Sequence, residues 1–332
     1  MARHHWVSIG LVAGVVLATV PLLVVGGNWS SVLAQTLLDF GHVPLFGLIA
    51  TLCLVLADHR FGDRSVATQY IGAFAGALIV GVATELAQMF GKRDADLWDL
   101  ARNAAGAALA LVWWATFDRR LDATAIRRRG SRIALCAVGI VVTLALLTPI
   151  LGAVRAYRER DDRFPVLFSF ETSSQARFMR TRLAWYELAP PPDAWSVDAP
   201  KRVAHISFLA LTGCAIVFNE PYPDWTGQEA LILEVFLPGE RKIRLGLRID
   251  DGKNTMLFKD RFNRSVVLEP GLNRLRISMA EIVAGPEERE LDISSIDRIV
   301  IFPIGVEDRC EIYLGPVVLE TAETATSSTS PG

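Results

Sequence analysis

Charged residues are scarce in this chain of 332 residues: Asp, Glu, Lys and Arg make up only 21%, whereas 51% of the residues are hydrophobic. That composition excludes a chain that is water-soluble throughout. The net charge of −2 and the lack of a long basic run give no reason to expect a nucleic-acid partner. The apolar excess lies before Arg155, and the remainder has the charge density of a soluble domain. The chain therefore combines a membrane region with a water-soluble one.

Cysteine is also rare, with four residues in all. Cys53 and Cys136 lie inside apolar stretches, where a thiol behaves as a small hydrophobe. Cys214 and Cys310 lie in the soluble part, and their spacing matches no zinc motif, so no metal site is expected. They form either a disulfide in an oxidising compartment or two buried free thiols, and the sequence leaves both open.

Five apolar stretches approach the roughly 20 residues that a membrane-spanning helix needs. They cover residues 7–26, 40–57, 68–90, 98–117 and 133–154. The first could instead be a signal peptide cleaved after Ala34, but its apolar stretch is long for one, which favours a retained helix. We therefore predict an α-helical transmembrane bundle of five helices over residues 1–157.

The arginines indicate how these helices cross the membrane. Arg3, the loop at 58–67 and the arginine-rich loop at 118–132 alternate along the chain with loops that carry less positive charge. Positively charged loops stay in the cytoplasm, so the N-terminus is predicted to be cytoplasmic. An odd number of crossings then places everything after residue 154 outside the cytoplasm.

Polar side chains inside membrane spans are costly, so their positions are informative. The predicted topology gathers one polar pocket at the outer ends of three spans, formed by Asp39, His42, Glu85, Gln88, Arg93, Asp96, Asp99 and Asn103. Spacings of three and four place the members of each span on one helix face. They form either an interhelical network or a site for a headgroup, in which His42 shuttles a proton and Arg93 meets a phosphate.

At these residues the chain resembles the VanZ-like membrane family. The match runs Glu85-x-x-Gln88, then Arg93-x-x-Asp96-x-x-Asp99-x-x-x-Asn103-x-x-Gly106, after Asp39-x-x-His42, and covers roughly residues 30–117. Phe40 stands where a Lys is expected after the Asp. The resemblance implies a bacterial inner-membrane protein, in a family whose founding member is linked to resistance to the glycopeptide teicoplanin. It implies no reaction.

From about residue 164 the pattern changes to short β-like runs. Turn signals such as Pro238-Gly239, Asp250-Asp251-Gly252 and Pro270-Gly271 separate them, which predicts an all-β sandwich over residues 164–320. The last residues, 321–332, are rich in Ser and Thr and have no strand pattern, so we expect a disordered tail.

The same segment resembles the jelly-roll domains of carbohydrate-binding modules and galactose-binding-like proteins. The resemblance is carried by Phe170-Glu171, Asp224-Trp225-Thr226-Gly227, Asp260-Arg261-Phe262-Asn263-Arg264 and Ile312-Tyr313-Leu314-Gly315. It implies glycan binding. Such domains often place an acid where Gly315 stands, which helps the Glu at position 171 to hold calcium, so no structural calcium or other cofactor is expected here.

Sugars are commonly held by an aromatic ring against the pyranose and by polar groups around its hydroxyls. The candidates in loop-like stretches are Trp195, Tyr222, Trp225, Asp260, Arg261 and Asn263. The alternative is that Trp225 belongs to the core and that Arg261 pairs with Asp260.

Two functions from different classes follow. The first is a non-enzymatic envelope protein that binds a glycan or a lipid-linked cell-wall component, with a link to glycopeptide tolerance. The second is a membrane enzyme that modifies a lipid-linked sugar or phosphate with His42, Glu85 and the Asp96/Asp99 pair. The sequence favours the first, with membrane lipids and a glycan as partners. A transporter would need internal repeats and mid-membrane polar groups, which we do not find.

Overall fold

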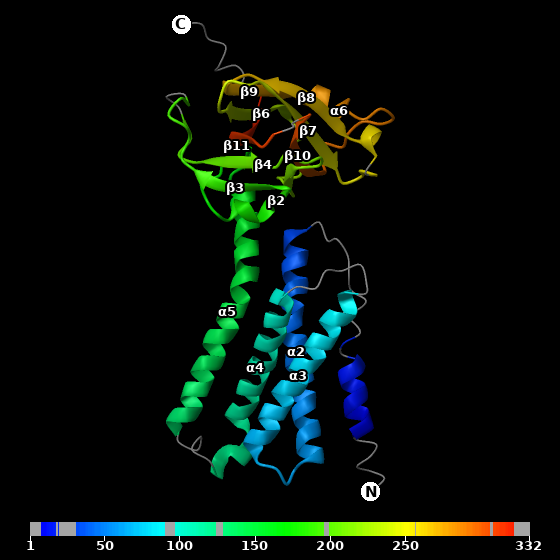
Figure 1. Ribbon diagram of the computed structural model, residues 1–332, viewed down its shortest axis with the longest axis vertical. Coiled ribbons are helices and arrows are strands. Elements are labelled where there is room, and N and C mark those ends of the chain that lie inside the picture. Colours follow the sequence, from blue (N-terminus) through cyan, green and yellow to red (C-terminus); the bar gives the residue numbers. More distant parts are fainter. Residues whose placement is uncertain are drawn as a thin grey trace. The chain divides into compact units, whose positions relative to one another are not determined.

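The computed structural model describes residues 8–17, 19, 31–89, 97–123, 129–195, 199–255, 257–305 and 308–321. The chain divides into two compact units. The helical unit comprises Met1–Trp29 and Leu33–Leu151, and the β unit comprises Ser30–Val32 and Gly152–Gly332. Figure 1 shows the helices of the first and the two sheets of the second.

The described helices are a short apolar helix Ser8–Leu17, then α2 Val32–Arg60, α3 Val66–Met89, α4 Leu97–Phe117, η1 Arg119–Ala123 and α5 Arg129–Asp162. Long helices suit apolar sequence because every backbone group is bonded within the segment. Three of them, Val32–Arg60, Val66–Gln88 and Gly130–Asp162, are long and apolar enough to cross a membrane. The prediction of five spans is thus supported for three, since α4 carries several polar residues and residues 20–30 lie outside the described part.

The helices α2, α3 and α4 pack around a small apolar core. Its buried members are Phe46, Ile49, Ala50, Leu54, Ala73, Ala77, Ala107 and Leu111. Gly106 of α4 lies directly on α2, because a Cβ added there would overlap the backbone of Val43. Only glycine permits so close an approach of two helix backbones.

The β unit is a sandwich of two antiparallel sheets, as the sequence predicted. Sheet 1 has the order β3-β4-β11-β6-β9, with β1 also paired to β11, and its bounds are β1 Val166–Phe168, β3 Ala184–Ala189, β4 Val203–Phe208, β6 Gln228–Leu237, β9 Gly271–Ser278 and β11 Cys310–Thr321. Sheet 2 has the order β2-β5-β10-β7-β8, and its bounds are β2 Met179–Arg182, β5 Ala215–Asn219, β7 Ile243–Asp251, β8 Phe262–Leu268 and β10 Ile296–Ile304. Short helices η3 Gln175–Phe178, η4 Phe258–Asp260 and α6 Met279–Val283 connect strands.

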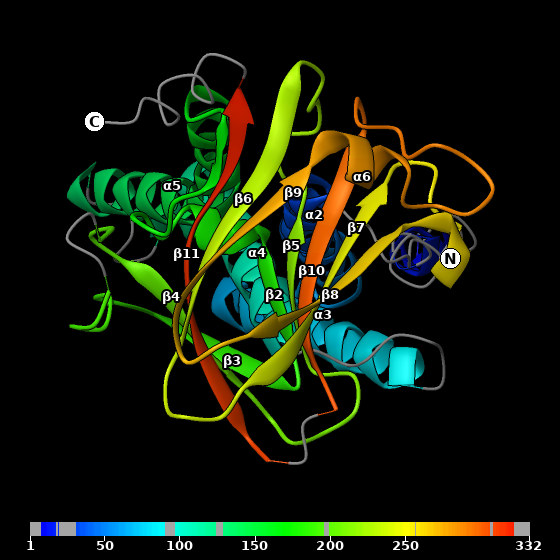
Figure 2. The same cartoon turned by 90° about the horizontal axis from the view of Figure 1, so that it is seen from above.

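Strand alternation builds the core between the sheets. Leu245, Leu247 and Ile249 of β7 point inward and are buried, while the residues between them point outward. Seen from above, β11 and β6 of sheet 1 run side by side, as do β10 and β7 of sheet 2 (Figure 2). The outward positions of neighbouring strands therefore lie in rows across the outer side of each sheet.

The last turns of α5 belong to the β unit. Ala156 is fully buried in the sandwich core, and the ring of Tyr157 lies edge-on to Phe178 with a centroid distance of 5.1 Å. The Tyr157 hydroxyl donates to Glu220 Oε2 at 2.6 Å, and the backbone N–H of Val32 donates to the same oxygen at 2.7 Å. Glu220, at the end of β5, thus joins two distant parts of the chain.

Candidate functional site

In the helical unit, His42 of α2 lies against α4. Its Nδ1 is 2.9 Å from Asn103 Oδ1, and its Nε2 is 3.7 Å from Asp99 Oδ2. His42, Asp99 and Asn103 are all buried. The structure therefore brings together these three predicted pocket residues.

The cation that completes this cluster is one that the sequence analysis missed. Arg102 approaches Asp99 with a nitrogen–oxygen distance of 2.5 Å and Asp39 with one of 3.3 Å. Its position three residues after Asp99 is the spacing at which side chains meet on a helix. The expected cation, Arg93, lies outside the described residues, as does Asp96.

Glu85 and Gln88 are buried near the end of α3. Among the described residues, no group of three or more His, Cys, Asp or Glu side chains is arranged to hold a metal ion. The observed contacts are those of an interhelical network of the kind that fixes helix packing. A headgroup-binding or acid–base role for this cluster stays a prediction.

In the sandwich, the prediction of Trp225 as a sugar platform is wrong. Trp225 is fully buried between the sheets, and its Nε1 donates to the carbonyl of Tyr222 at 2.7 Å. Tyr222 packs its ring on Phe164 at a centroid distance of 4.3 Å. Trp225 belongs to the core because its ring fills the space between two apolar faces, which is the alternative that the sequence left open.

Trp195 is buried as well and stacks on Phe236 with a centroid distance of 6.0 Å. It covers Gly315, where an added Cβ would lie 2.9 Å from the indole ring. The ring of Trp195 thus needs a glycine at position 315, which is a packing reason for the missing acid. A ring closed over in this way offers no free face to a sugar.

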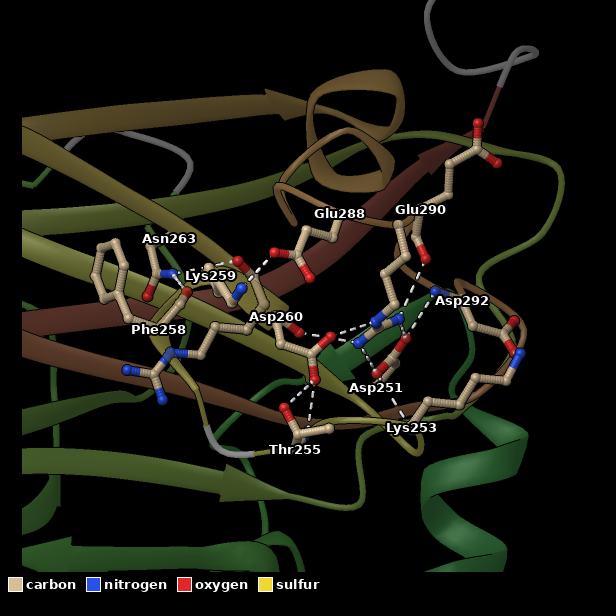
Figure 3. A network of polar contacts seen from close by, with 12 residues as sticks. Asp251, Lys253, Thr255, Phe258, Lys259, Asp260, Asn263, Glu288, Glu290 and Asp292 are labelled. Atoms are coloured by element: carbon tan, nitrogen blue, oxygen red, sulfur yellow. Dashed lines mark hydrogen bonds and ion pairs between the residues drawn. The ribbon is translucent and has the colours of Figure 1, made fainter.

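Asp260 belongs to a charged network rather than to an open surface (Figure 3). Arg289 binds Asp260 and also holds Asp251 with distances of 2.5 and 2.8 Å, and Asp251 is 1% exposed. The hydrogen bond from Arg289 is the largest cause that holds the pKa of Asp260 well below its usual range. The bonds to Asp251 and Asp260 in turn raise the pKa of Arg289. Hydrogen bonds from Ser294 and Lys253 lower the pKa of the neighbouring Asp292 to about 2. The network fixes the connection between β7 and β8.

This fixed connection leads into Arg261 and Asn263, which lie on the outer side of sheet 2. Asn263 is opposite Arg248, and the same row continues across the sheet through Val300 and Val217 to Arg180. The next row contains Arg298 opposite Asp250, beside Arg261. We call this surface the arginine face, and its members are Arg244, Arg248, Arg261, Asn263, Arg298 and Phe302.

The arginine face carries more positive than negative charge. Asp250 is fully buried beneath it and binds Arg248 at 2.6 and 2.7 Å and Arg298 at 2.8 Å. Burial and the neighbouring Arg248 and Arg298 lower the pKa of the Arg261 guanidinium, against the effect of Asp250. Asp297 also contacts Arg298, but burial raises the pKa of Asp297.

An aromatic ring lies flat in the middle of this surface. A Cβ added at Gly246 would overlap three ring atoms of Phe302, so the Phe302 ring covers that glycine. Phe258, which is 68% exposed, stands at the rim with Arg261 5.7 Å from its ring centre. Beyond Arg244 and Ile304 the face continues into a cleft of about 1080 Å³ that Arg241, Lys242 and Arg309 also line. The surface thus combines a flat ring with forked cationic donors.

Cys214 and Cys310 are both free thiols in the sandwich core. Burial, and then the nearby Cys214, raise the pKa of Cys310 to about 11. The fold brings the two sulfurs into the same neighbourhood, and the disulfide stays a prediction.

No protein-family model matches the chain, and no curated protein matches it. Solved structures similar to its C-terminal β region include an exo-β-agarase, with 12% identity over 47% of this chain and a TM-score of 0.38. A family 11 carbohydrate-binding module from Clostridium thermocellum, in complex with a mixed-linked tetrasaccharide, has 13% identity over 47% of this chain and 95% of its own, with a TM-score of 0.35. The CBM22-1 xylan-binding domain of Paenibacillus barcinonensis Xyn10C has 13% identity over 47% of this chain and 96% of its own, with a TM-score of 0.32.

This chain spans 24% of the length of the exo-β-agarase. Identities this low concern the fold alone, and the binding properties in those names are not carried over to this chain. The VanZ-like resemblance of residues 30–117 gains no support from the family models, so it stays a prediction.

Proposed function

We propose that this chain is a membrane-anchored glycan-binding protein whose sandwich holds a negatively charged sugar on the arginine face. The observation that carries the proposal is the cluster of Arg248, Arg261 and Arg298 around a single buried Asp250, next to the flat ring of Phe302. Three helices that are long and apolar enough to cross a membrane supply the anchor.

The chemistry of the face fits an acidic sugar. A guanidinium group binds a carboxylate or a sulfate through two parallel hydrogen bonds, and a flat aromatic ring packs against the apolar face of a pyranose. Asn263 adds an amide that can read a hydroxyl group. A neutral glycan would leave the half-buried charge of Arg261 without a partner, so it is the weaker ligand.

The arginine distribution among the loops supports a location of the sandwich outside the cytoplasm. In a bacterial envelope, which the VanZ-like resemblance implies, the ligand would be an acidic surface polysaccharide or cell-wall polymer. Any link to glycopeptide tolerance rests on that resemblance and is part of the proposal.

Binding by the full chain in detergent micelles tests this proposal. Calorimetry with uronate-containing oligosaccharides should show saturable binding that weakens with salt, whereas neutral oligosaccharides of equal length bind more weakly. Arg261→Ala should lower the affinity about 10- to 100-fold, because one charge-assisted hydrogen-bonding group contributes about 1.5–3 kcal/mol.

Arg274→Ala is the matched control, since Arg274 is an exposed arginine on β9 of the other sheet. Its affinity should equal that of the natural chain. Equal affinity for acidic and neutral oligosaccharides, or an equal effect of the two substitutions, would contradict the proposal.

A further inference from the structure

One corner of the sandwich exposes three large apolar side chains. Leu183, between β2 and β3, is 41% exposed; Trp185 in β3 is 42% exposed; and Leu211, between β4 and β5, is 54% exposed. Backbone hydrogen bonds link them, from Leu209 N to the Leu183 carbonyl at 3.0 Å and from Leu211 N to the Leu209 carbonyl at 2.8 Å. We call Leu183, Trp185 and Leu211 the apolar corner.

The backbone of this corner is held in an unfavourable conformation. Leu183 has a φ of 49°, which lies in the left-handed region that side chains other than glycine rarely adopt. Strained residues persist where the surrounding structure and a function require them. Here the strain presents a leucine to solvent, although a glycine would make the same turn without strain and without exposed apolar surface.

Arginines accompany the apolar corner. Arg182 is exposed, and its guanidinium carbon lies 3.6 Å from where a Cβ of Gly213 would be. The guanidinium of Arg309 lies 4.0 Å from the ring centre of Trp185. Tryptophan, leucine and arginine together are the composition of surfaces that lie at the boundary between water and lipid.

The apolar corner can be compared in position with the last turns of α5, which belong to the β unit. The side chain of Arg177 lies against Gly152 of α5, and the preceding part of α5 is apolar and almost entirely exposed. Leu183 follows Arg177 by six residues, which extend at most roughly 20 Å. Within the β unit, Leu183 therefore lies within roughly 20 Å of Arg177, whose side chain contacts α5 just before its charged residues begin at Arg155.

From these observations we propose that the apolar corner rests in the headgroup layer of the membrane that α5 enters. Leu183, Trp185 and Leu211 bury their side chains there, and Arg182 and Arg309 bind lipid phosphates. This contact does not need the proposed glycan binding, because Arg248, Arg261 and Arg298 take no part in it; only Arg309 also lines the cleft beside the arginine face.

A spin label in the β4–β5 connection tests the proposal with the full chain in phosphatidylcholine nanodiscs. Thr212→Cys is labelled after the four native cysteines are replaced by alanine, and Ser265→Cys on β8 serves as the reference. For each label, the collision rate with oxygen is divided by the collision rate with a water-soluble nickel complex. This ratio should be several-fold higher for the label at 212 than for the label at 265. Equal accessibility at the two positions would overturn the proposal.

A charge placed in the corner gives a second measurement that does not depend on the label alone. Leu211→Asp should return the label at 212 to the accessibility of the reference, because an ionised carboxylate is costly to bury against apolar lipid where the leucine side chain would lie. Leu272→Asp, at a position of 39% exposure on β9, should leave it unchanged. The label at 212 could also be protected from the nickel complex by a second copy of the chain. Protection that persists in lipid-free detergent and grows with protein concentration would indicate this and would also overturn the proposal.

Discussion

At the scale of single residues, the sequence pointed to two members of the proposed arginine face and to none of the strand residues beside them. Arg261 and Asn263 were recognised because a short polar run stood in a loop-like stretch. The sequence did not indicate Arg248, Arg298 or Phe302. Each lies at an outward position of a strand, where the alternating pattern does not distinguish one residue from another. Only strand pairing shows that they face the same surface, because residues 50 apart in the chain become neighbours in β7 and β10.

Gly246 is the residue whose role is easiest to isolate. Gly246→Ala should lower the affinity for the acidic oligosaccharide about fivefold, because the new Cβ displaces the Phe302 ring and aromatic packing contributes about 1 kcal/mol. Calorimetry measures the change. In a Phe302→Ala background the glycine substitution should have no further effect; additive losses would show that Gly246 acts by another route.

At the scale of elements, the kinds of secondary structure were predictable and the connections between them were not. Apolar stretches of the right length predicted the long helices, and alternation with turn residues predicted the strands. The loop between β7 and β8 was interpreted as a binding loop, whereas Arg289 holds it through Asp251 and Asp260. That interaction joins positions 38 apart, which no local pattern reveals.

The Arg289 network should stabilise the sandwich strongly. Arg289→Met leaves the buried Asp251 carboxylate without its cation, so unfolding by urea should require about 3 kcal/mol less free energy. Arg241→Met is the control, because its ion pair with Asp308 is almost fully exposed and should contribute less than about 1 kcal/mol. Similar losses in the two variants would mean that the network does not fix the loop.

Acid gives an independent measure of the same network. The pKa of Asp260 is lower in the folded protein than in the unfolded chain. As the pH falls, the Asp260 carboxylate is therefore protonated first in the unfolded chain. The stabilisation that this group contributes is present above about pH 4 and is lost below it. Asp292, with a pKa of about 2, acts in the same direction. The loss of stability between about pH 5 and pH 2 should therefore be smaller in Arg289→Met, as urea unfolding at each pH would record.

At the scale of the whole molecule, composition alone separated an apolar half from a soluble half. Five spans were predicted and three are supported, because Asp99, Arg102 and Asn103 lower the hydropathy of α4 and residues 20–30 lie outside the described part. The structure brings His42, Asp99 and Asn103 together with Arg102 of α4. The sequence named Arg93 as the cation of this pocket, and Arg93 lies outside the described residues.

The two units should respond separately to damage. Gly106→Ala forces α4 away from the backbone of Val43 and should destabilise the helical unit by about 1–3 kcal/mol. Hydrogen exchange should accelerate in α2 and α4, while exchange in the strands and glycan affinity stay as they are. Gly72→Ala is the control, since nothing lies within 4 Å of a Cβ there. Faster exchange throughout the sandwich after Gly106→Ala would contradict this separation.

The β unit is not one continuous stretch of the chain, and Glu220 helps to hold its separate parts together. It accepts hydrogen bonds from Val32 and Tyr157, and Ala156 fills part of the sandwich core. A shortened chain that begins at residue 164 would lose all three groups, leaving a buried hole and a carboxylate without its donors. Its failure to fold would therefore say nothing about the proposed ligand, and studies of the β unit should retain the helix that leads into it.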